Sequence, residues 1–364
     1  MSDYVTIVCP ICNSGIEFKT EDETIRCPHC DAVIGKEAAL IWDAAEEQSR
    51  ENFTWDTTGS AWQPREADGL RSYTCQACGA QILADETADA AECPHCGKAL
   101  LMDEQLSFRL KPDVVIPFKI AKNDAIAALS RHYKGKRLLP KIFRDQNYVK
   151  QITPVFVPVW LFDTKGSVEA YYKGTKLNEW SDEDYNYKET SFYAAARKGT
   201  ISYVNVPVDG ASRMDDRFMQ SLRPFDFSEA IPFDKSCLGG CLEAQCDVAA
   251  DASASTAEGW INRSLKSGLL NTVSGYTGTA EMRCDFELTG KARLALLPVW
   301  LLNTRWNGQV FTFMMNGQTG EFVGDLPMDK AAYWKWTIGT GVAGATAAVA
   351  LNVLIWLVNL WMIT

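Results

Sequence analysis

Histidine is scarce in this chain of 364 residues, which contains three. His29 and His95 each stand between two cysteines, and His132 lies in a basic stretch without an evident Cys or Ser partner. This leaves little material for nucleophilic catalysis of the Ser-His or Cys-His kind. Carboxylates are plentiful, but they show no pairing that points to acid–base chemistry. We therefore expect no enzyme, and no catalytic residue is predicted.

Nucleotide-binding motifs are missing as well. None of the four Gly-Lys pairs is followed by Ser or Thr, which excludes a P-loop, and no G-x-S-x-G is present. Gly339-Thr-Gly-Val-Ala-Gly344 matches G-x-G-x-x-G, but it lies in an apolar run with no strand before it and no acid about 20 residues later. We attribute this match to small residues packing in a helix.

Positive charge is in deficit, with 36 Lys and Arg against 46 Asp and Glu and a formal net charge of −10. The first 25 residues also lack an apolar run behind a basic start, so we expect no signal peptide. The cysteines are therefore expected to lie in a reducing compartment, the cytoplasm.

Eight of the twelve cysteines form four Cys-x-x-Cys pairs in the first hundred residues. Both halves of this stretch read C-x2-C-x14-C-x2-C, and each cysteine of the second half lies 66 positions after its counterpart. Two such pairs brought together by a short hairpin complete a tetrahedral site of four thiolates. We predict two zinc ribbons with one ion each and the ligands Cys9, Cys12, Cys27, Cys30, Cys75, Cys78, Cys93 and Cys96.

A shell of four thiolates leaves no open position on the metal, so a structural role is expected rather than catalysis. Iron in a rubredoxin-like site is the alternative metal, although the spacing favours zinc. His29 and His95 are expected to be surface residues rather than ligands. Of the remaining cysteines, we expect small core residues rather than a third metal site at Cys237, Cys241, Cys246 and Cys284.

The predicted fold is multidomain: two small β zinc ribbons, a duplicated β-rich α+β domain and one C-terminal transmembrane helix. The ribbons cover 1–36 and 71–102, and an acidic linker with tryptophans, 37–70, separates them. The α+β domain covers 107–327 and the transmembrane helix 336–363.

The duplication in the α+β domain is visible in two matching segments. Val157-Pro-Val-Trp-Leu-Phe-Asp-Thr164 and Leu297-Pro-Val-Trp-Leu-Leu-Asn-Thr304 share five of eight positions, and Ile231-Pro-Phe233 echoes Ile116-Pro-Phe118. A strand–helix–hairpin unit is predicted to occur twice, over about 113–206 and 229–323. Turns are expected at 163–166 and 197–199, and helices at 123–133, 237–246 and 252–267.

The last 29 residues, 336–364, carry no charge and are long enough to cross a bilayer. Tyr333, Trp334 and Trp336 precede them as an interfacial belt would, with Lys330 and Lys335 on the same side. The body is expected to stay in the cytoplasm of a bacterial cell and the chain to end across its membrane. Small residues and amides within the span predict a helix partner, homotypic or heterotypic, and these are Gly341, Gly344, Asn352 and Asn359.

Nucleic-acid binding is the usual expectation for zinc ribbons, but the charge argues against it. Residues 1–36 hold six acids against three bases, and 71–98 hold four against two. One basic stretch does occur within 131–150, where seven bases face a single acid. It is either a surface for anionic lipid headgroups or a solvated face.

With these features in view, the chain resembles a bacterial family, the TFIIB-type zinc ribbon-containing membrane proteins, which are often mislabelled as primosomal-protein or PriA-like helicases. The likeness includes Leu139-Pro-Lys-Ile-Phe143, the segment 85–96 and Asn316-Gly-Gln-Thr-Gly-Glu-Phe-Val-Gly-Asp-Leu-Pro327. The resemblance implies a non-enzymatic adaptor that recruits SPFH-domain or PspA-like proteins to the cytoplasmic face of the membrane during envelope stress. The alternative is a zinc-ribbon protein that binds nucleic acid in replication or transcription.

Overall fold

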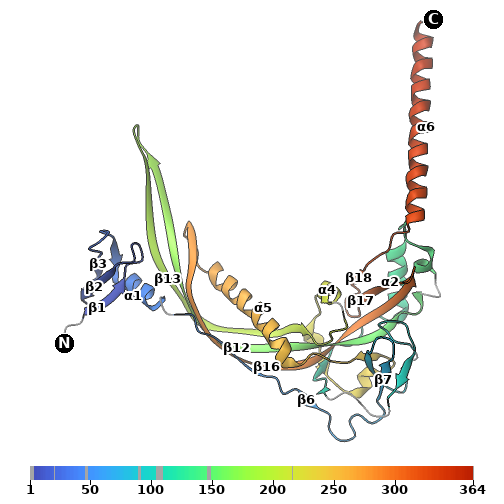
Figure 1. The fold of residues 1–364 in the computed structure, drawn as a ribbon, viewed down its shortest axis with the longest axis horizontal. Helices are drawn as coiled ribbons and strands as arrows, with labels where there is room; N and C mark the ends of the chain where they lie inside the picture. Colours follow the sequence, from blue (N-terminus) through green and yellow to red (C-terminus); the bar gives the residue numbers. More distant parts are fainter. Residues whose placement is uncertain are drawn as a thin grey trace. The chain divides into compact units, whose positions relative to one another are not determined.

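The computed structural model describes residues 4–19, 21–45, 48–88, 92–103, 110–145, 149–214 and 216–363. The chain divides into two compact units (Figure 1). Unit 1 comprises Met1–Ser60, Trp160–Gly210 and Val248–Leu294, and unit 2 comprises Ala61–Val159, Ala211–Asp247 and Ala295–Thr364. As predicted, the chain contains two small β-hairpin units with four cysteines each, a β-rich α+β body and a long apolar C-terminal helix.

The first ribbon, in unit 1, consists of two separate hairpins followed by a helix. β1 pairs antiparallel with β2 and β3 with β4. Alternate residues of these strands, among them Ile7, Ile16 and Ile25, are buried, as expected for half-buried strands. They form a small core with Trp42 of the helix. The bounds are β1 Tyr4–Val8, β2 Gly15–Lys19, β3 Thr24–Arg26, β4 Val33–Gly35 and α1 Lys36–Ala45.

The rest of unit 1 is built from very long strands and one helix. β5 runs parallel to β16, with Glu51 opposite Phe286 and Asp56 opposite Lys291. Part of the stretch predicted as a linker is therefore a paired strand. The bounds are β5 Glu51–Asp56, β12 Thr153–Ser181, β13 Asn186–Asp209, α5 Ala250–Asn271 and β16 Gly278–Trp306, of which β12 and β16 begin or end in unit 2.

The turns predicted at 163–166 and 197–199 are wrong, because β12 and β13 run straight through them. Gly166 is required by close packing rather than by a turn, since a Cβ there would lie 1.8 Å from the carbonyl oxygen of Glu287. The α-helix predicted near 237–246 is also wrong, since the short 3-10 helix η3 Lys235–Leu238 ends at its start and strand β15 Leu242–Ala244 follows. The helices predicted over 123–133 and 252–267 are confirmed as α2 Lys122–Tyr133 and α5.

The second ribbon lies in unit 2 and is part of a larger sheet. Its strand β8 pairs with β7 on one side and with β15 on the other, and β15 in turn runs parallel to β12. Leu83, Phe156 and Glu243 are aligned across these strands. The ribbon strands are β7 Arg71–Cys75, β8 Gln81–Ala84 and β9 Leu100–Met102.

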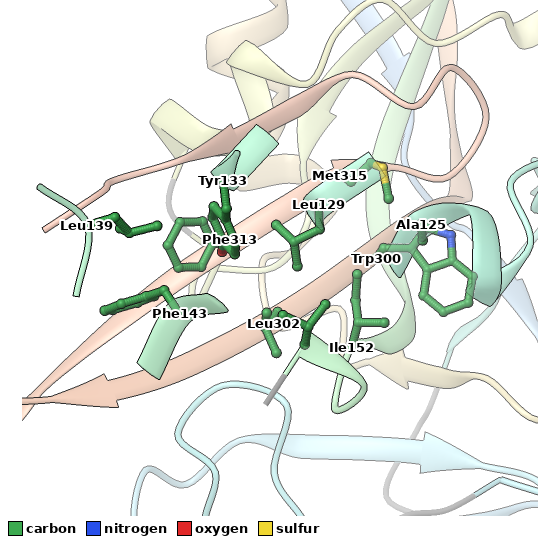
Figure 2. Close-up of a cluster of buried hydrophobic side chains, with 11 residues drawn as sticks. Ala125, Leu129, Tyr133, Leu139, Phe143, Ile152, Trp300, Leu302, Phe313 and Met315 are labelled. Atoms are coloured by element: carbon green, nitrogen blue, oxygen red, sulfur yellow. The ribbon is translucent and has the colours of Figure 1, made fainter. Parts of the chain in front are cut away.

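The core of unit 2 forms where α2 covers β16 and β17 (Figure 2). Leu129 and Tyr133 of the helix pack with Trp300, Leu302 and Phe313 of the strands. The ring centroids of Tyr133 and Phe313 are 5.7 Å apart in an edge-to-face arrangement. The remaining elements are β6 Ser60–Ala61, β10 Leu110–Lys111, β11 Val114–Val115, η1 Lys141–Arg144, α4 Asp216–Ser221, η2 Phe227–Glu229, β14 Ile231–Pro232, β17 Gln309–Asn316, β18 Phe322–Gly324 and α6 Lys330–Ile363.

The order of elements follows the sequence duplication. β11, α2, β12 and β13 are followed by β14, α5, β16 and β17, and β11 pairs antiparallel with β14. The helix of each half, however, lies in the same compact unit as the tryptophan of the Pro-Val-Trp-Leu segment of the other half. Unit 1 contains Trp160 and α5, and unit 2 contains Trp300 and α2.

Helix α6 has no buried residue in the stretch Lys330–Val358, whose apolar composition and length suffice to cross a membrane. Lys330 and Lys335 are the charged residues of the helix, and both lie near its start. An apolar face this long in contact with water would be costly, so its exposure fits a lipid environment.

Candidate metal centres

The four cysteines of the first ribbon converge on one point. Their sulfur atoms all lie within 4.8 Å of one another. The Sγ atoms of Cys9 and Cys30 are 3.8 Å apart, and those of Cys12 and Cys27 are 3.7 Å apart. The hairpin turns between β1 and β2 and between β3 and β4 carry these residues.

The second ribbon repeats this arrangement at the predicted positions. Cys75 and Cys96 have sulfurs 3.5 Å apart, and those of Cys78 and Cys93 are 3.7 Å apart. The edge of a tetrahedron with Zn–S bonds of about 2.3 Å is about 3.8 Å, whereas a disulfide brings sulfurs to about 2.05 Å. Both groups therefore have the spacing of four metal-ligating thiolates, and both can hold a metal ion.

All four Cys-x-x-Cys turns share one backbone geometry. The residue after the second cysteine has a positive φ and donates its N–H to the carbonyl of the first cysteine, with distances of 2.7–3.0 Å. Only Gly, Asn and Asp adopt this conformation readily. The four positions hold such residues, namely Asn13, Asp31, Gly79 and Gly97. The turn thus folds the chain so that two sulfurs point the same way.

The first ribbon has a hydroxyl aimed at its sulfurs. Ser14 Oγ lies 3.0 Å from the Sγ of Cys12 and 3.5 Å from that of Cys27. The hydrogen bond from Ser14 lowers the pKa of the Cys27 thiol to about 6, against burial, which raises it. The position 66 residues later is Ala80, which has no hydroxyl. The two sites therefore differ in the groups around their ligands.

The second ribbon is held to the body by its metal-binding turns. Arg213 donates to the carbonyl oxygen of Cys78, and Arg305 donates to that of Cys96 at 3.3 Å. The Asn303 side-chain amide donates to the carbonyl of Pro94, and its Oδ1 accepts from Thr312 at 2.7 Å. Both turns are thus fixed by side chains of unit 2.

Asn303 occupies the position that Asp163 occupies in the first half of the duplication. In unit 1 the Asp163 carboxylate binds Arg293 at 2.8 Å and accepts the N–H of Asn205 at 2.7 Å. A carboxylate cannot donate to a carbonyl, whereas an amide can. The Asp-to-Asn difference between the halves therefore agrees with the contact that Asn303 makes with the second ribbon and that Asp163 does not make among the described residues. Sequence reasoning missed this role of Asn303, although the difference is visible in the aligned repeats.

His29 and His95, which are predicted not to be metal ligands, belong to neither group of four cysteines. His29 is exposed, as expected, whereas His95 is half-buried and not fully at the surface. His95 is half-buried beside a cavity of about 340 Å³, together with Arg213, Arg217 and Asn303. Burial and then the charge of Arg213 lower the pKa of this imidazole.

The other four cysteines do not join a group of metal ligands within the described ranges. Cys237 and Cys241 pack against the apolar cluster around Phe156 and Phe233, and Cys284 is fully buried. Burial raises the pKa of the Cys284 thiol to about 11. The core role predicted for these three residues fits their places, and Cys246 is half-buried.

Within α6, the predicted helix-partner residues are exposed where they are described. A Cβ on Gly341 or Gly344 would meet nothing within 4 Å, which leaves both positions open to a neighbouring helix. The Asn352 side chain donates to the carbonyl of Ala348 at 2.9 Å, which uses one of the two hydrogens of its amide within the helix. The side chain of Asn359 lies outside the described residues.

Comparison with curated proteins finds a similarity that covers nearly the whole chain. The chain is 29% identical over 344 residues to the uncharacterized protein YdjG of Bacillus subtilis (strain 168), which is 94% of this chain and 95% of YdjG. No family model matches the chain, and no solved structure matches it. The name of the relative carries no activity.

Proposed function

We propose that this protein is a non-enzymatic, tail-anchored membrane adaptor that holds two zinc ions and uses its ribbons as contact surfaces for partner proteins. α6 anchors the chain in a bacterial membrane, and the body and ribbons lie on the cytoplasmic side. The partners are SPFH-domain or PspA-like proteins of the envelope-stress response. Each zinc has four thiolate ligands, and its role is to hold a ribbon folded.

The observation that carries the proposal is the exposed apolar surface of the first ribbon. Ile11 is 46% exposed and Val33 is 62% exposed, and each lies within or beside a metal-binding turn. On a small rigid module such side chains are available for contact with a partner protein. Both turns of the second ribbon are bonded to the body. In the first ribbon, as far as the structure describes it, the turn that contains Ile11 has one such bond, in which Lys173 donates to the carbonyl oxygen of Pro10 at 3.3 Å.

Acidic charge supports a protein partner over nucleic acid. The first ribbon has twice as many acids as bases, and phosphate backbones are bound chiefly by Lys and Arg. A closed shell of four thiolates also offers the metal no position for substrate. The runner-up function is a zinc-ribbon protein that binds nucleic acid.

The test is capture of the full chain from its own membranes after crosslinking, with identification of the captured molecules. The wild type is compared with Ile11→Glu/Val33→Glu and with a control, Val204→Glu, on an exposed strand position of the same unit. We expect SPFH- or PspA-like proteins with the wild type and the control, and their loss with the double variant. Nuclease-sensitive nucleic acid in their place would support the runner-up and overturn the adaptor.

A further inference from the structure

The basic loop that follows α2, residues 134–141, is attached to the start of α6. The Arg137 guanidinium lies 4.5 Å above the ring of Trp336, a cation–π contact. The backbone N–H of Asp329 donates to the carbonyl of Leu138 at 2.9 Å. Two separate contacts thus hold the loop beside the first two turns of α6.

The loop is also anchored at both ends by the core of unit 2. Tyr133 precedes the loop and Leu139 lies near its end, and both belong to the buried cluster beneath α2 (Figure 2). Phe143 in η1 joins the same cluster. The residues between these anchors therefore keep a fixed place relative to α6 and are not a free tail.

The last turn of α2, the loop and the start of α6 present a group of exposed bases without matching acids. Five of these bases form no ion pair with a carboxylate in the part of the chain that the structure describes. Elsewhere in unit 2, Lys111 and Lys119 are bonded to Glu66 and Glu229. The nearby Asp329 uses its carboxylate to accept the N–H groups of Ala331 and Ala332. The five bases are Arg131, Lys134, Lys141, Lys330 and Lys335.

Exposed aromatic rings lie in the same first turns of α6 as Lys330 and Lys335. Trp334 is 61% exposed and Trp336 is 42% exposed, and no charged residue follows Lys335 in α6. Tryptophans at the end of an apolar helix sit at the headgroup level of a bilayer. Bases attached to that turn would lie in the layer that contains the phosphates of the lipids.

We propose that the loop 134–141 and the first turns of α6 form one binding surface for the phosphate headgroups of anionic lipids. The proposal rests on the membrane placement of α6 in the proposed function. It adds an electrostatic contact that selects the lipids around the anchor and fixes how the body of unit 2 meets the bilayer. Nucleic acid shares the phosphate chemistry, but the apolar helix and its tryptophans favour the membrane.

The experiment uses the full chain in a neutral detergent, titrated with phosphatidylglycerol or phosphatidylcholine, with bound lipid counted by native mass spectrometry. The test variant is Lys134→Gln/Arg137→Gln/Lys141→Gln. The matched control, Lys176→Gln/Lys188→Gln/Lys198→Gln, removes three bases from β12 and β13 of unit 1. Two further arms add inorganic phosphate at constant ionic strength and a short DNA duplex. Zinc content and circular dichroism check that each variant is folded.

We expect the wild type and the control to prefer phosphatidylglycerol. The test variant should bind it more weakly by roughly fivefold per base removed, and salt raised from about 50 to about 500 mM should reduce the preference. Equal binding of the two lipids, or an equal loss in the control, would overturn the proposal. Displacement by inorganic phosphate, or tighter binding of the duplex that depends on the same three bases, would assign the surface to another phosphate source.

Failure of this inference is distinguishable from failure of the proposed function. Resistance of the wild type to alkaline extraction from membranes tests whether α6 is an anchor, and it does not depend on the three bases. Partner capture is tested with substitutions in the first ribbon, which belongs to unit 1, whereas the three bases belong to unit 2. An anchored, partner-binding protein without lipid preference would therefore overturn only the lipid surface.

Discussion

The indole Nε1 of Trp300 donates to the carbonyl oxygen of Ile120 at 3.0 Å, two residues before the first residue of α2. In the other unit, Trp160 Nε1 donates at 2.8 Å to Val248, two residues before the first residue of α5. Trp160 and Trp300 are equivalent in the duplicated sequence, yet each one fixes the helix of the opposite half. The repeated hydrogen bond therefore joins two halves that exchange their helices.

Replacing Trp300 by Phe removes this donor while keeping an aromatic ring in the core. We expect a loss of about 1–2 kcal/mol in the free energy of unfolding, since the Ile120 carbonyl loses its indole donor. Amide exchange should become faster in the first turn of α2 and stay unchanged in α5. Trp160→Phe is the matched variant and should give the reverse pattern. Equal effects on both helices would contradict the exchange.

Asn303→Asp should loosen the second ribbon. The carboxylate cannot donate to Pro94 and adds negative charge beside a cluster of thiolates, so we expect a cost of about 1–3 kcal/mol. Faster metal loss to a chelator and faster amide exchange over 93–98 are the measurements. Asp163→Asn makes the opposite change at the equivalent position in unit 1 and should leave the second ribbon unaffected. If Asn303→Asp releases metal at the wild-type rate, the amide does not hold the ribbon.

Ser14→Ala should weaken metal binding in the first ribbon alone. Groups that hydrogen-bond to metal ligands typically account for 10–100-fold in affinity, and we expect a loss of about tenfold. Competition with a chromogenic chelator resolves the two ions of one chain, and the second site, with Ala80, serves as the internal control. A loss of affinity at both sites would point to general destabilisation instead of the Ser14 hydroxyl.

The fold class and the two cysteine groups could be predicted because both depend on local spacing. Four Cys-x-x-Cys pairs at fixed distances determine which sulfurs can meet, and a charge-free run at 336–364 determines a long apolar helix. The pairing of β5 with β16 was not predictable in this way, because strands more than 200 residues apart leave no local signal.

The long strands were missed for a related reason. Gly166 and Gly199 resemble turn signals, but Gly166 serves a close approach of two backbones that appears only when the chain is folded. The docking role of Asn303 likewise depends on which module lies next to it. Sequence patterns report the conformation of a segment better than they report its neighbours.

Glu243 is a carboxylic acid in a fully apolar place. It lies in β15 between Leu83 and Phe156, both members of a buried cluster, and its Oε2 has no hydrogen-bond partner among the described residues. Burial raises the pKa of this carboxyl to about 8. The folded state therefore binds one more proton than the unfolded state between about pH 4.5 and about pH 8.

Because the folded state holds the extra proton, the contribution of Glu243 to stability falls as the pH rises through this window, by up to about 1.4 kcal/mol per pH unit. Glu243→Gln removes the titration, so the free energy of unfolding of the variant should rise by about 2 kcal/mol relative to that of the wild type as the pH goes from about 6 to about 8. Denaturant unfolding of the full chain in detergent with saturating zinc measures this difference. The control is Glu321→Gln at an exposed position, and its free energy of unfolding should vary with pH as that of the wild type does. A Glu243→Gln profile parallel to the wild type would mean that this carboxyl does not titrate with folding.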